Sequence, residues 1–256
     1  MFPNFPDKQE NKPIFTPSEF IDYLKKTGRF PEFPAPSGII FSYQKTLLNY
    51  VISNHQTTKM ETTLGEMHLL KDTENQIAIV GKLGIGAPAV ITALEELNAW
   101  GVKKFISIGT AGTLQKNLSI GDIVVCDKAI RDEGVSHHYL KPEKFAFASL
   151  EMVEKIKKSL ERLGQKYQVG PSWTIDAPYR ETIDEAKKYQ KEGILTVEME
   201  AAALFAVAAY RKIQMGAVFT ISDSLSDLKW SPDFYHQETK EGLEVLYKVA
   251  LEALYL

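Results

Sequence analysis

The chain has 256 residues, of which 44% are hydrophobic and 25% charged, a composition typical of a globular protein. Its formal net charge of −3 argues against a nucleic-acid partner, which would need a basic face. Cys126 is the only cysteine, so an intrachain disulfide and a cysteine-based zinc cage are excluded. No apolar run approaches the ~20 residues of a transmembrane helix, and the N-terminus lacks the pattern of a secretory signal. We therefore expect a cytoplasmic protein that does not bind membranes.

The predicted elements begin with a proline- and aromatic-rich arm, residues 1–38, which contains a short helix near 17–26. Strand and helix signals then alternate along one domain, residues 39–256. Strands are predicted over 76–82, 105–109, 122–130, 168–175, 194–198 and 215–222, and helices over 87–100, 149–163, 182–192, 201–211 and 238–256. This alternation predicts an α/β fold with three layers, α/β/α, around a central mixed sheet.

The segment 196–203 (TVEMEAAA) places two carboxylates on either side of a methionine. If the strand continues through it, Glu198 and Glu200 project to one side and Met199 to the other. Two carboxylates could then hold a vicinal diol while the thioether packs against its carbon face. The alternative is that both acids begin the helix 201–211, where they would complement the helix dipole.

Polar residues also follow the other predicted strands. In an α/β fold, ligands bind at the carboxyl ends of the strands, so these residues are expected to meet at one rim. They are Thr110, Ala111 and Gly112 after one strand, Arg131 after the next, and Ser222 and Asp223 after the last long strand.

The loop 81–86 reads G-x-x-G-x-G, which is not the order of a dinucleotide fingerprint. A tight loop before a helix still suits an anion or a polar ligand. His137 and His138 are adjacent and the other histidines are scattered, so we expect no metal site and no cofactor.

Five segments together resemble the nucleoside phosphorylase family, which includes hexameric purine nucleoside phosphorylases, uridine phosphorylases and methylthioadenosine nucleosidases. The segments are 81–88, 107–112, 120–124, 197–203 and 221–223. The resemblance implies a phosphorylase/hydrolase-like fold, a homo-oligomer (dimer or hexamer), and nucleoside and phosphate as substrates.

The resemblance also implies roles for single residues. Glu200 matches the glutamate that binds the ribose hydroxyls, and Met199 matches the methionine packed on the sugar. Thr110 matches a hydroxyl residue that helps to hold phosphate. Asp223 matches the aspartate that protonates or hydrogen-bonds purine N7 as the base leaves, a form of general-acid catalysis.

Two departures from the family pattern concern phosphate. Ser107 replaces an arginine that the phosphorylases usually carry. The nearest equivalent of their N-terminal phosphate loop is 35–40, around Gly38, and it lacks the arginine. We therefore expect phosphate to be held by backbone amides, Thr110, Gly38 and a replacement arginine such as Arg131.

The segment 174–182 lies where the family places base-contacting residues, so Tyr179 and Arg180 are candidates for the substrate site. This segment is similar to a variant found in uridine phosphorylase-like proteins, whereas Asp223 favours a purine. The leading hypothesis is a pentosyltransferase, a purine nucleoside phosphorylase. The alternatives are a uridine phosphorylase, a hydrolytic nucleosidase on the same scaffold, and a non-catalytic nucleoside-binding protein.

Overall fold

The computed structural model describes residues 4–5, 7–31, 33–63 and 65–256. The helices are α1 (Pro17–Lys26), α2 (Lys45–Asn54), α3 (Ala87–Trp100), α4 (Leu150–Arg162), α5 (Ile183–Lys191), α6 (Ala201–Arg211) and α7 (Gln237–Tyr255). The strands are β1 (Gly38–Ser42), β2 (Thr57–Glu61), β3 (Glu66–Leu70), β4 (Ile77–Gly81), β5 (Lys104–Thr113), β6 (Ile123–Asp132), β7 (Phe145–Phe147), β8 (Gln168–Ile175), β9 (Thr196–Glu198), β10 (Gln214–Ser224) and β11 (Ser231–Pro232).

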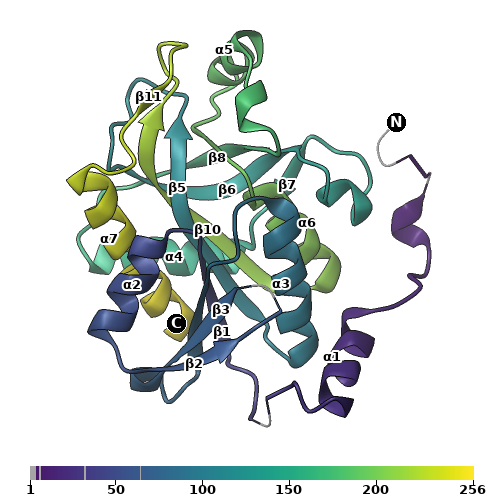
Figure 1. Ribbon diagram of the computed structural model, residues 1–256. Coiled ribbons are helices and arrows are strands. Elements are labelled where there is room, and N and C mark those ends of the chain that lie inside the picture. The colour runs from purple at the N-terminus through teal and green to yellow at the C-terminus, as the bar shows by residue number, and fades with distance from the viewer. Residues whose placement is uncertain (1–3, 6, 32, 64) are drawn as a thin grey trace.

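The strands form one mixed sheet between two layers of helices (Figure 1). Its order is β11-β10-β6-β8-β9-β5-β1-β4-β3-β2, with β7 beside β6. Helices α2, α4 and α7 cover one face, and α3 and α6 cover the other. The predicted three-layer α/β/α fold with a central mixed sheet is therefore confirmed.

Part of the sheet closes on itself, which the sequence pattern does not indicate. Strand β10 pairs in parallel with β5 and antiparallel with β6. Hydrogen bonds also pair β6 with β8, β8 with β9, and β9 with β5. Together with β10, these strands form a closed ring of five. The ring brings the carboxyl ends of β5, β9 and β10 together.

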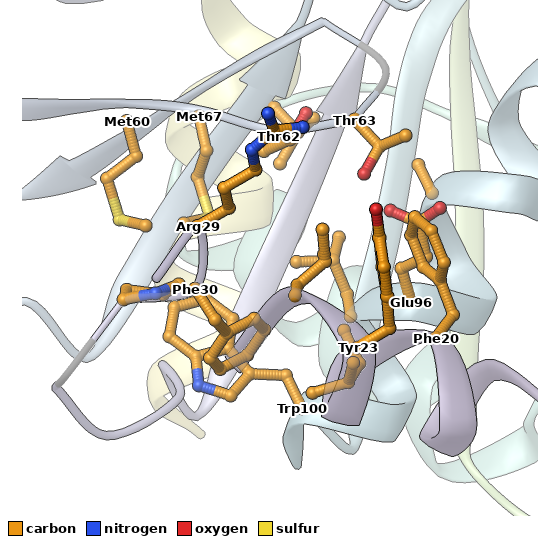
Figure 2. Close-up of a pocket in the computed structure, with 16 residues that line it drawn as sticks. Phe20, Tyr23, Arg29, Phe30, Met60, Thr62, Thr63, Met67, Glu96 and Trp100 are labelled. Carbon is orange, nitrogen blue, oxygen red and sulfur yellow. The ribbon is translucent and has the colours of Figure 1, made fainter. Parts of the chain in front are cut away.

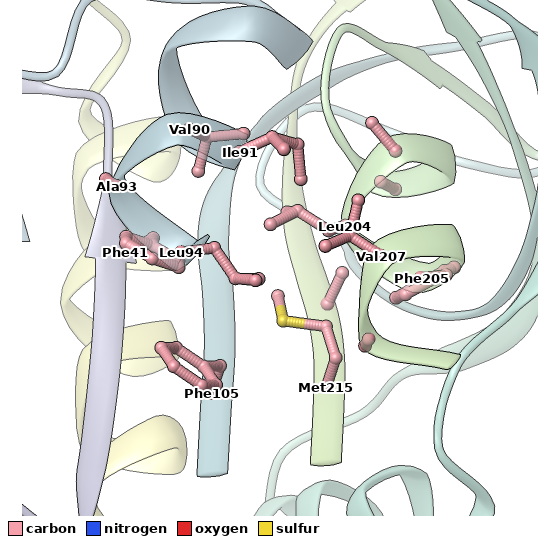
Figure 3. Close-up of a cluster of buried hydrophobic side chains, with 14 of the residues drawn as sticks. Phe41, Val90, Ile91, Ala93, Leu94, Phe105, Leu204, Phe205, Val207 and Met215 are labelled. Atoms are coloured by element: carbon pink, nitrogen blue, oxygen red, sulfur yellow. The ribbon is translucent and has the colours of Figure 1, made fainter. Parts of the chain in front are cut away.

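Helices α3 and α6 pack against the sheet through a large apolar cluster (Figure 3). Val90 and Leu94 of α3 face Leu204 of α6, and Met215 of β10 lies beneath them. Most of α6 is alanine, so its backbone can approach its neighbours closely, and every residue from Ala201 to Ala208 is buried. This packing fixes both the start of α6 and the glycine-rich loop before α3.

Helix α1 of the N-terminal arm lies against α3, on the outside of the molecule (Figure 1). Phe30 and Phe33 pack edge-on against Trp100, with ring centroids 5.5 and 5.7 Å away. Between the arm and the body is an apolar cavity of about 440 Å³, in which Glu96 lies near aromatic rings of α1 (Figure 2).

Helices α1, α3 and α6 have the bounds that the sequence pattern predicts. Strands β5 and β10 are longer than predicted, reaching Thr113 and Ser224. No helix in the described part of the chain combines the length and apolarity that crossing a bilayer requires.

Candidate functional site

A cavity of about 660 Å³ opens at the carboxyl ends of β5, β9 and β10. Of the residues proposed from the sequence, it is lined by Thr110, Ala111, Gly112, Tyr179, Glu198, Met199, Glu200, Ser222 and Asp223. Gly38, Arg131 and Arg180 do not line it. The cavity wall also contains residues that sequence reasoning missed: Tyr43, Gln44, Ile85, Glu181, Ile183, Leu225, Leu228, Lys229, Trp230 and Phe234.

Glu200 is the N-cap residue of α6 and is only 8% exposed. The backbone N–H of Gly86 donates to its Oε1 at 2.6 Å. Gly86 has φ of 98°, a conformation that favours glycine, so the loop before α3 can bring this amide to the carboxylate. Burial, followed by the charge of Glu198, raises the pKa of Glu200 to about 8.

Glu198 lines the cavity, but its carboxylate is bonded to neighbouring groups of the fold. Its Oε1 accepts hydrogen bonds from the hydroxyls of Ser172 and Thr174. Its Oε2 accepts the N–H groups of Glu200 and Ala201 at 2.8 and 2.7 Å. Both oxygens are thus engaged at the start of α6, and burial, the largest influence, raises the pKa of this carboxyl despite those hydrogen bonds. Of the two roles considered for these acids, the contact with the helix start applies to Glu198. The role of diol binding remains for Glu200, which lines the cavity.

Asp223 also lines the cavity and is 7% exposed. Its Oδ1 accepts from the Ser222 hydroxyl at 2.7 Å, and its Oδ2 accepts from the Trp230 indole N–H at 3.0 Å. Burial is the largest influence on its carboxyl group and raises its pKa. A carboxyl that keeps its proton more readily is better suited to donate it.

A local irregularity in β10 directs Asp223 toward its neighbour strand. The register with β5 shifts between Ile221 and Asp223, so that Asp223 pairs with Gly112. A Cβ at Gly112 would lie 2.8 Å from Asp223 Oδ2, which is too close. Glycine at position 112 is therefore needed for the approach of the acid to β5.

Hydroxyl and amide groups also line the cavity. Gln44 Nε2 donates to Thr110 Oγ1 at 3.1 Å, and the Tyr43 hydroxyl is 2.9 Å from the Ser107 hydroxyl. Tyr43 and Gln44 directly follow β1, whose buried sequence GIIFS was the only signal that could have identified them. Ser107, where an arginine is expected, is therefore paired with Tyr43.

Gly38 is at the wrong end of its strand for the phosphate role. It begins β1 and pairs with Lys104, the first residue of β5, whereas Ser42 pairs with Ile108. The end of β1 that reaches the cavity is thus the carboxyl end, near Thr110. The prediction for Gly38 is corrected, and the residues that occupy this position are Tyr43 and Gln44.

Arg131 is also corrected, because its guanidinium makes four hydrogen bonds within the fold and does not line the cavity. It is 6% exposed and donates to the Ser136 hydroxyl and to the carbonyls of Ser136, Leu140 and Lys141 at 2.7 to 3.1 Å. These bonds tie down the loop after β6. Arg131 therefore ties down a loop of the fold and does not line the cavity.

Replacing Arg131 with methionine is expected to destabilise the protein. The carbonyls of the loop would lose a charged donor, and each such loss costs about 1–3 kcal/mol. We expect a clear drop in Tm and, in the folded fraction, a phosphate KM within about twofold of wild type. The exposed Arg162→Met is the control for thermal unfolding. A large rise in phosphate KM with unchanged Tm would contradict this assignment.

The two candidates on the β8–α5 loop lie in different places. The Tyr179 side chain is fully exposed at the mouth of the cavity. Arg180 lines a neighbouring surface hollow together with Asp132, Asp176 and Glu185. Of the two, only Tyr179 borders the cavity.

The cavity is lined by both polar and apolar side chains. Thr110, Gln44 and Glu200 contribute oxygen and nitrogen atoms, whereas Leu225 and Phe234 lie near Asp223. Such a cavity suits a ligand with a hydroxyl-rich part and a flat apolar part. Among the described residues, no cluster of three or more His, Cys, Asp or Glu side chains could hold a metal ion.

A family model described as the phosphorylase superfamily matches residues 46–254. A guanosine phosphorylase of Halorubrum lacusprofundi is 31% identical over 175 residues, 67% of this chain and 73% of the relative. A uridine phosphorylase of Thermococcus kodakarensis is 30% identical over 158 residues, 56% of each chain. The fold matches the crystal structure of a purine nucleoside phosphorylase from Toxoplasma gondii in complex with immucillin-H, with a TM-score of 0.75, 21% identity, and 86% and 90% coverage of this chain and that one. The chain therefore belongs to the phosphorylase superfamily.

Proposed function

We propose that the protein is a nucleoside phosphorylase, which cleaves the N-glycosidic bond of a purine nucleoside to give the free base and a pentose 1-phosphate. The observation that carries this proposal is the placement of Glu200 and Asp223 in one cavity. A diol-binding carboxylate and an acid for the leaving base are the two groups that such a cleavage requires.

Each group acts on a different part of the nucleoside. Glu200 binds the ribose 2′- and 3′-hydroxyls, held in place by the Gly86 amide, and Met199 packs against the sugar. The C1′–N9 bond breaks, its electron pair goes to the base, and Asp223 supplies a proton to N7. A phosphate oxygen then bonds to C1′. In its ionised form, Glu200 also favours the positive charge that develops on the sugar.

The phosphate end of the cavity lacks the expected arginines. Among the described residues that line it, Lys229 is the only basic one, and it is exposed. We propose that phosphate is held by the Thr110 hydroxyl, the Gln44 amide and backbone N–H groups of the loop before α3. Neutral donors of this kind can bind an anion at a helix N-terminus.

The proposed location, oligomeric state and co-substrate follow from the family resemblance. We propose a cytoplasmic homo-oligomer, a dimer or hexamer, that uses phosphate as co-substrate and needs neither a metal nor an organic cofactor. The aromatic arm, residues 1–38, offers exposed surface for such assembly: the side chains of Ile14 and Phe15 are exposed.

The proposal is tested by analysing products from a nucleoside panel with and without phosphate. We expect pentose 1-phosphate and free base, formed at a rate that depends on phosphate. Free pentose released at full rate in phosphate-free buffer would show a hydrolytic nucleosidase instead. Binding of nucleosides without any cleavage would show a non-catalytic binding protein.

A further inference from the structure

Glu66, the first residue of β3, carries a buried carboxylate that the reaction described above does not use. It is 6% exposed, and its Oε1 lies 2.8 Å from the Nζ atom of Lys82. Lys82 begins the loop that leads to α3, and Gly86 ends this loop by donating to Glu200 at 2.6 Å. We propose that the ion pair of Glu66 with Lys82 is a positioning element, which holds the loop so that the Gly86 N–H meets Glu200. The consequence for nucleoside binding rests on the proposed function, whereas the placement of the loop does not.

Glu66 lies where β4 leaves the sheet. It pairs with Gly81, the last residue of β4, and Lys82 follows directly. The turn before Glu66 packs closely against the same point, because a Cβ at Gly65 would lie only 2.3 Å from the Gly81 carbonyl oxygen. A side chain of β3 is thus placed at the first residue beyond the strand, where the path of the loop toward α3 begins.

The backbone of the loop has an unusual conformation. Lys82, Gly84 and Gly86 have φ of 57°, 83° and 98°, in the left-handed region that side chains other than glycine rarely adopt. Glycine occupies two of these positions, but a lysine occupies the first, where glycine would adopt the same conformation at lower cost. The presence of lysine is explained by its ammonium group, which contacts Glu66.

Groups outside the loop hold the carboxylate in place. Nζ of Lys59, on β2, lies 2.8 Å from Oε2 of Glu66, and Nε2 of His68 lies 3.3 Å from Oε1. Lys59, followed by Lys82, lowers the pKa of Glu66 to about 2, so this carboxylate is ionised across the neutral range. A buried charge requires such partners. Here they connect two strands of the sheet to the loop.

The two lysines provide a matched pair of variants. Both lie 2.8 Å from Glu66, and the side chains of Lys59 and Lys82 are 50% and 47% exposed. Lys59 belongs to the sheet, however, whereas Lys82 belongs to the loop. If the cluster only stabilises the fold, Lys59→Met and Lys82→Met should have the same effects. If it positions the loop, only Lys82→Met should change the loop.

Hydrogen exchange of the Gly86 amide measures the placement of the loop without any ligand. Its rate should rise about 3–10-fold in Lys82→Met, the effect expected for the loss of one partly buried ion pair, and should keep its wild-type value in Lys59→Met. Lys82→Arg retains the charge and should retain slow exchange. Equal exchange in wild type and Lys82→Met, or equal rises in the two methionine variants, would overturn the inference.

Nucleoside binding at saturating phosphate provides the second readout. A loop that is correctly placed in only a fraction of the molecules lowers the apparent affinity by that fraction, while a bound ligand restores the placement. In Lys82→Met, we therefore expect the KM for inosine to rise about 3–10-fold with kcat nearly unchanged. The Ki of 2′,3′-dideoxyinosine, which offers no diol to Glu200, should keep its wild-type value. Lys59→Met should change neither constant.

The two readouts separate this inference from the proposed function. If no nucleoside is cleaved in a phosphate-dependent way, the proposed function fails, but the exchange of the Gly86 amide still decides whether Lys82 positions the loop. If phosphorolysis is observed and the KM for inosine is the same in wild type and Lys82→Met, the link to Glu200 is overturned, although phosphorolysis itself stands.

Discussion

Glu200→Gln is expected to abolish most turnover and, at the same time, to make the unliganded protein more stable at alkaline pH. The carboxyl group lines the cavity at a position suited to a diol, and above about pH 8, where it is ionised, a neutral amide would lack the charge that favours a developing positive sugar. The amide oxygen can still accept the Gly86 N–H, so the fold of the loop before α3 should be retained.

The stability effect follows from the raised pKa of Glu200. Its ordinary value is 4.5, and in the folded protein it is about 8. Between these values the folded state holds a proton that the unfolded state has released, so stability falls as pH rises from about 4.5 to about 8. The loss is on the order of a few kcal/mol, since each unit of pKa shift corresponds to about 1.4 kcal/mol. Glutamine carries no such proton and avoids this loss.

The measurements are kcat/KM on the best nucleoside and Tm at about pH 6 and about pH 8.5. Wild type should lose more Tm over this interval than Glu200→Gln, and the surface variant Asp184→Asn should behave as wild type. Near-wild-type kcat/KM in Glu200→Gln would remove Glu200 from the ribose role. Equal loss of Tm in wild type and Glu200→Gln would contradict the stability argument.

Helices that depend on local signals could be predicted from the sequence to the residue. Helix α3 has an apolar face with period 3.6, Pro88 in its first turn and Gly101 just after its end, where φ is 134°. These signals need no distant partner. Similarly, Thr110 and Asp223 could be placed in the site because each is near the carboxyl end of a recognisable strand.

The errors concern features that only distant contacts determine. Arg131 follows a strand in the way a ligand-binding arginine would, but its partners are carbonyls of a later loop, which no periodicity encodes. Gly38 was misplaced because the start and direction of β1 depend on its pairing with β4 and β5. The ring closure through β10 and β5 is non-local for the same reason.

Asp223→Asn is expected to lower kcat for purine nucleosides by about 10²–10⁴-fold, the usual cost of losing general-acid assistance. A purine leaves readily only when N7 is protonated or strongly hydrogen-bonded, and burial helps Asp223 to keep the proton that it must donate. Asparagine retains the shape and can accept from Trp230, but it has no acidic proton.

A purely structural role for Asp223 is the main alternative, as a cap for a turn with Ser222 and Ser224. The two serines have different hydrogen-bond partners. Ser222 donates to Asp223, whereas the Ser224 hydroxyl is 2.9 Å from that of Ser226. The exposed Asp227→Asn is the control, because it removes a carboxylate from the adjoining loop that forms a surface ion pair with Lys116. It should leave kcat unchanged.

The base that leaves decides whether the acid matters. A pyrimidine has no N7, so Asp223 would contribute little to its departure and would repel the developing anion on the base. We therefore expect purine nucleosides to be cleaved well and uridine poorly by wild type, and Asp223→Asn to reduce only the purine rates. If wild type cleaves uridine well and guanosine, inosine and adenosine hardly at all, the purine assignment is wrong. Asp223 would then have to act through its hydrogen bonds to Ser222 and Trp230, holding the wall around a pyrimidine.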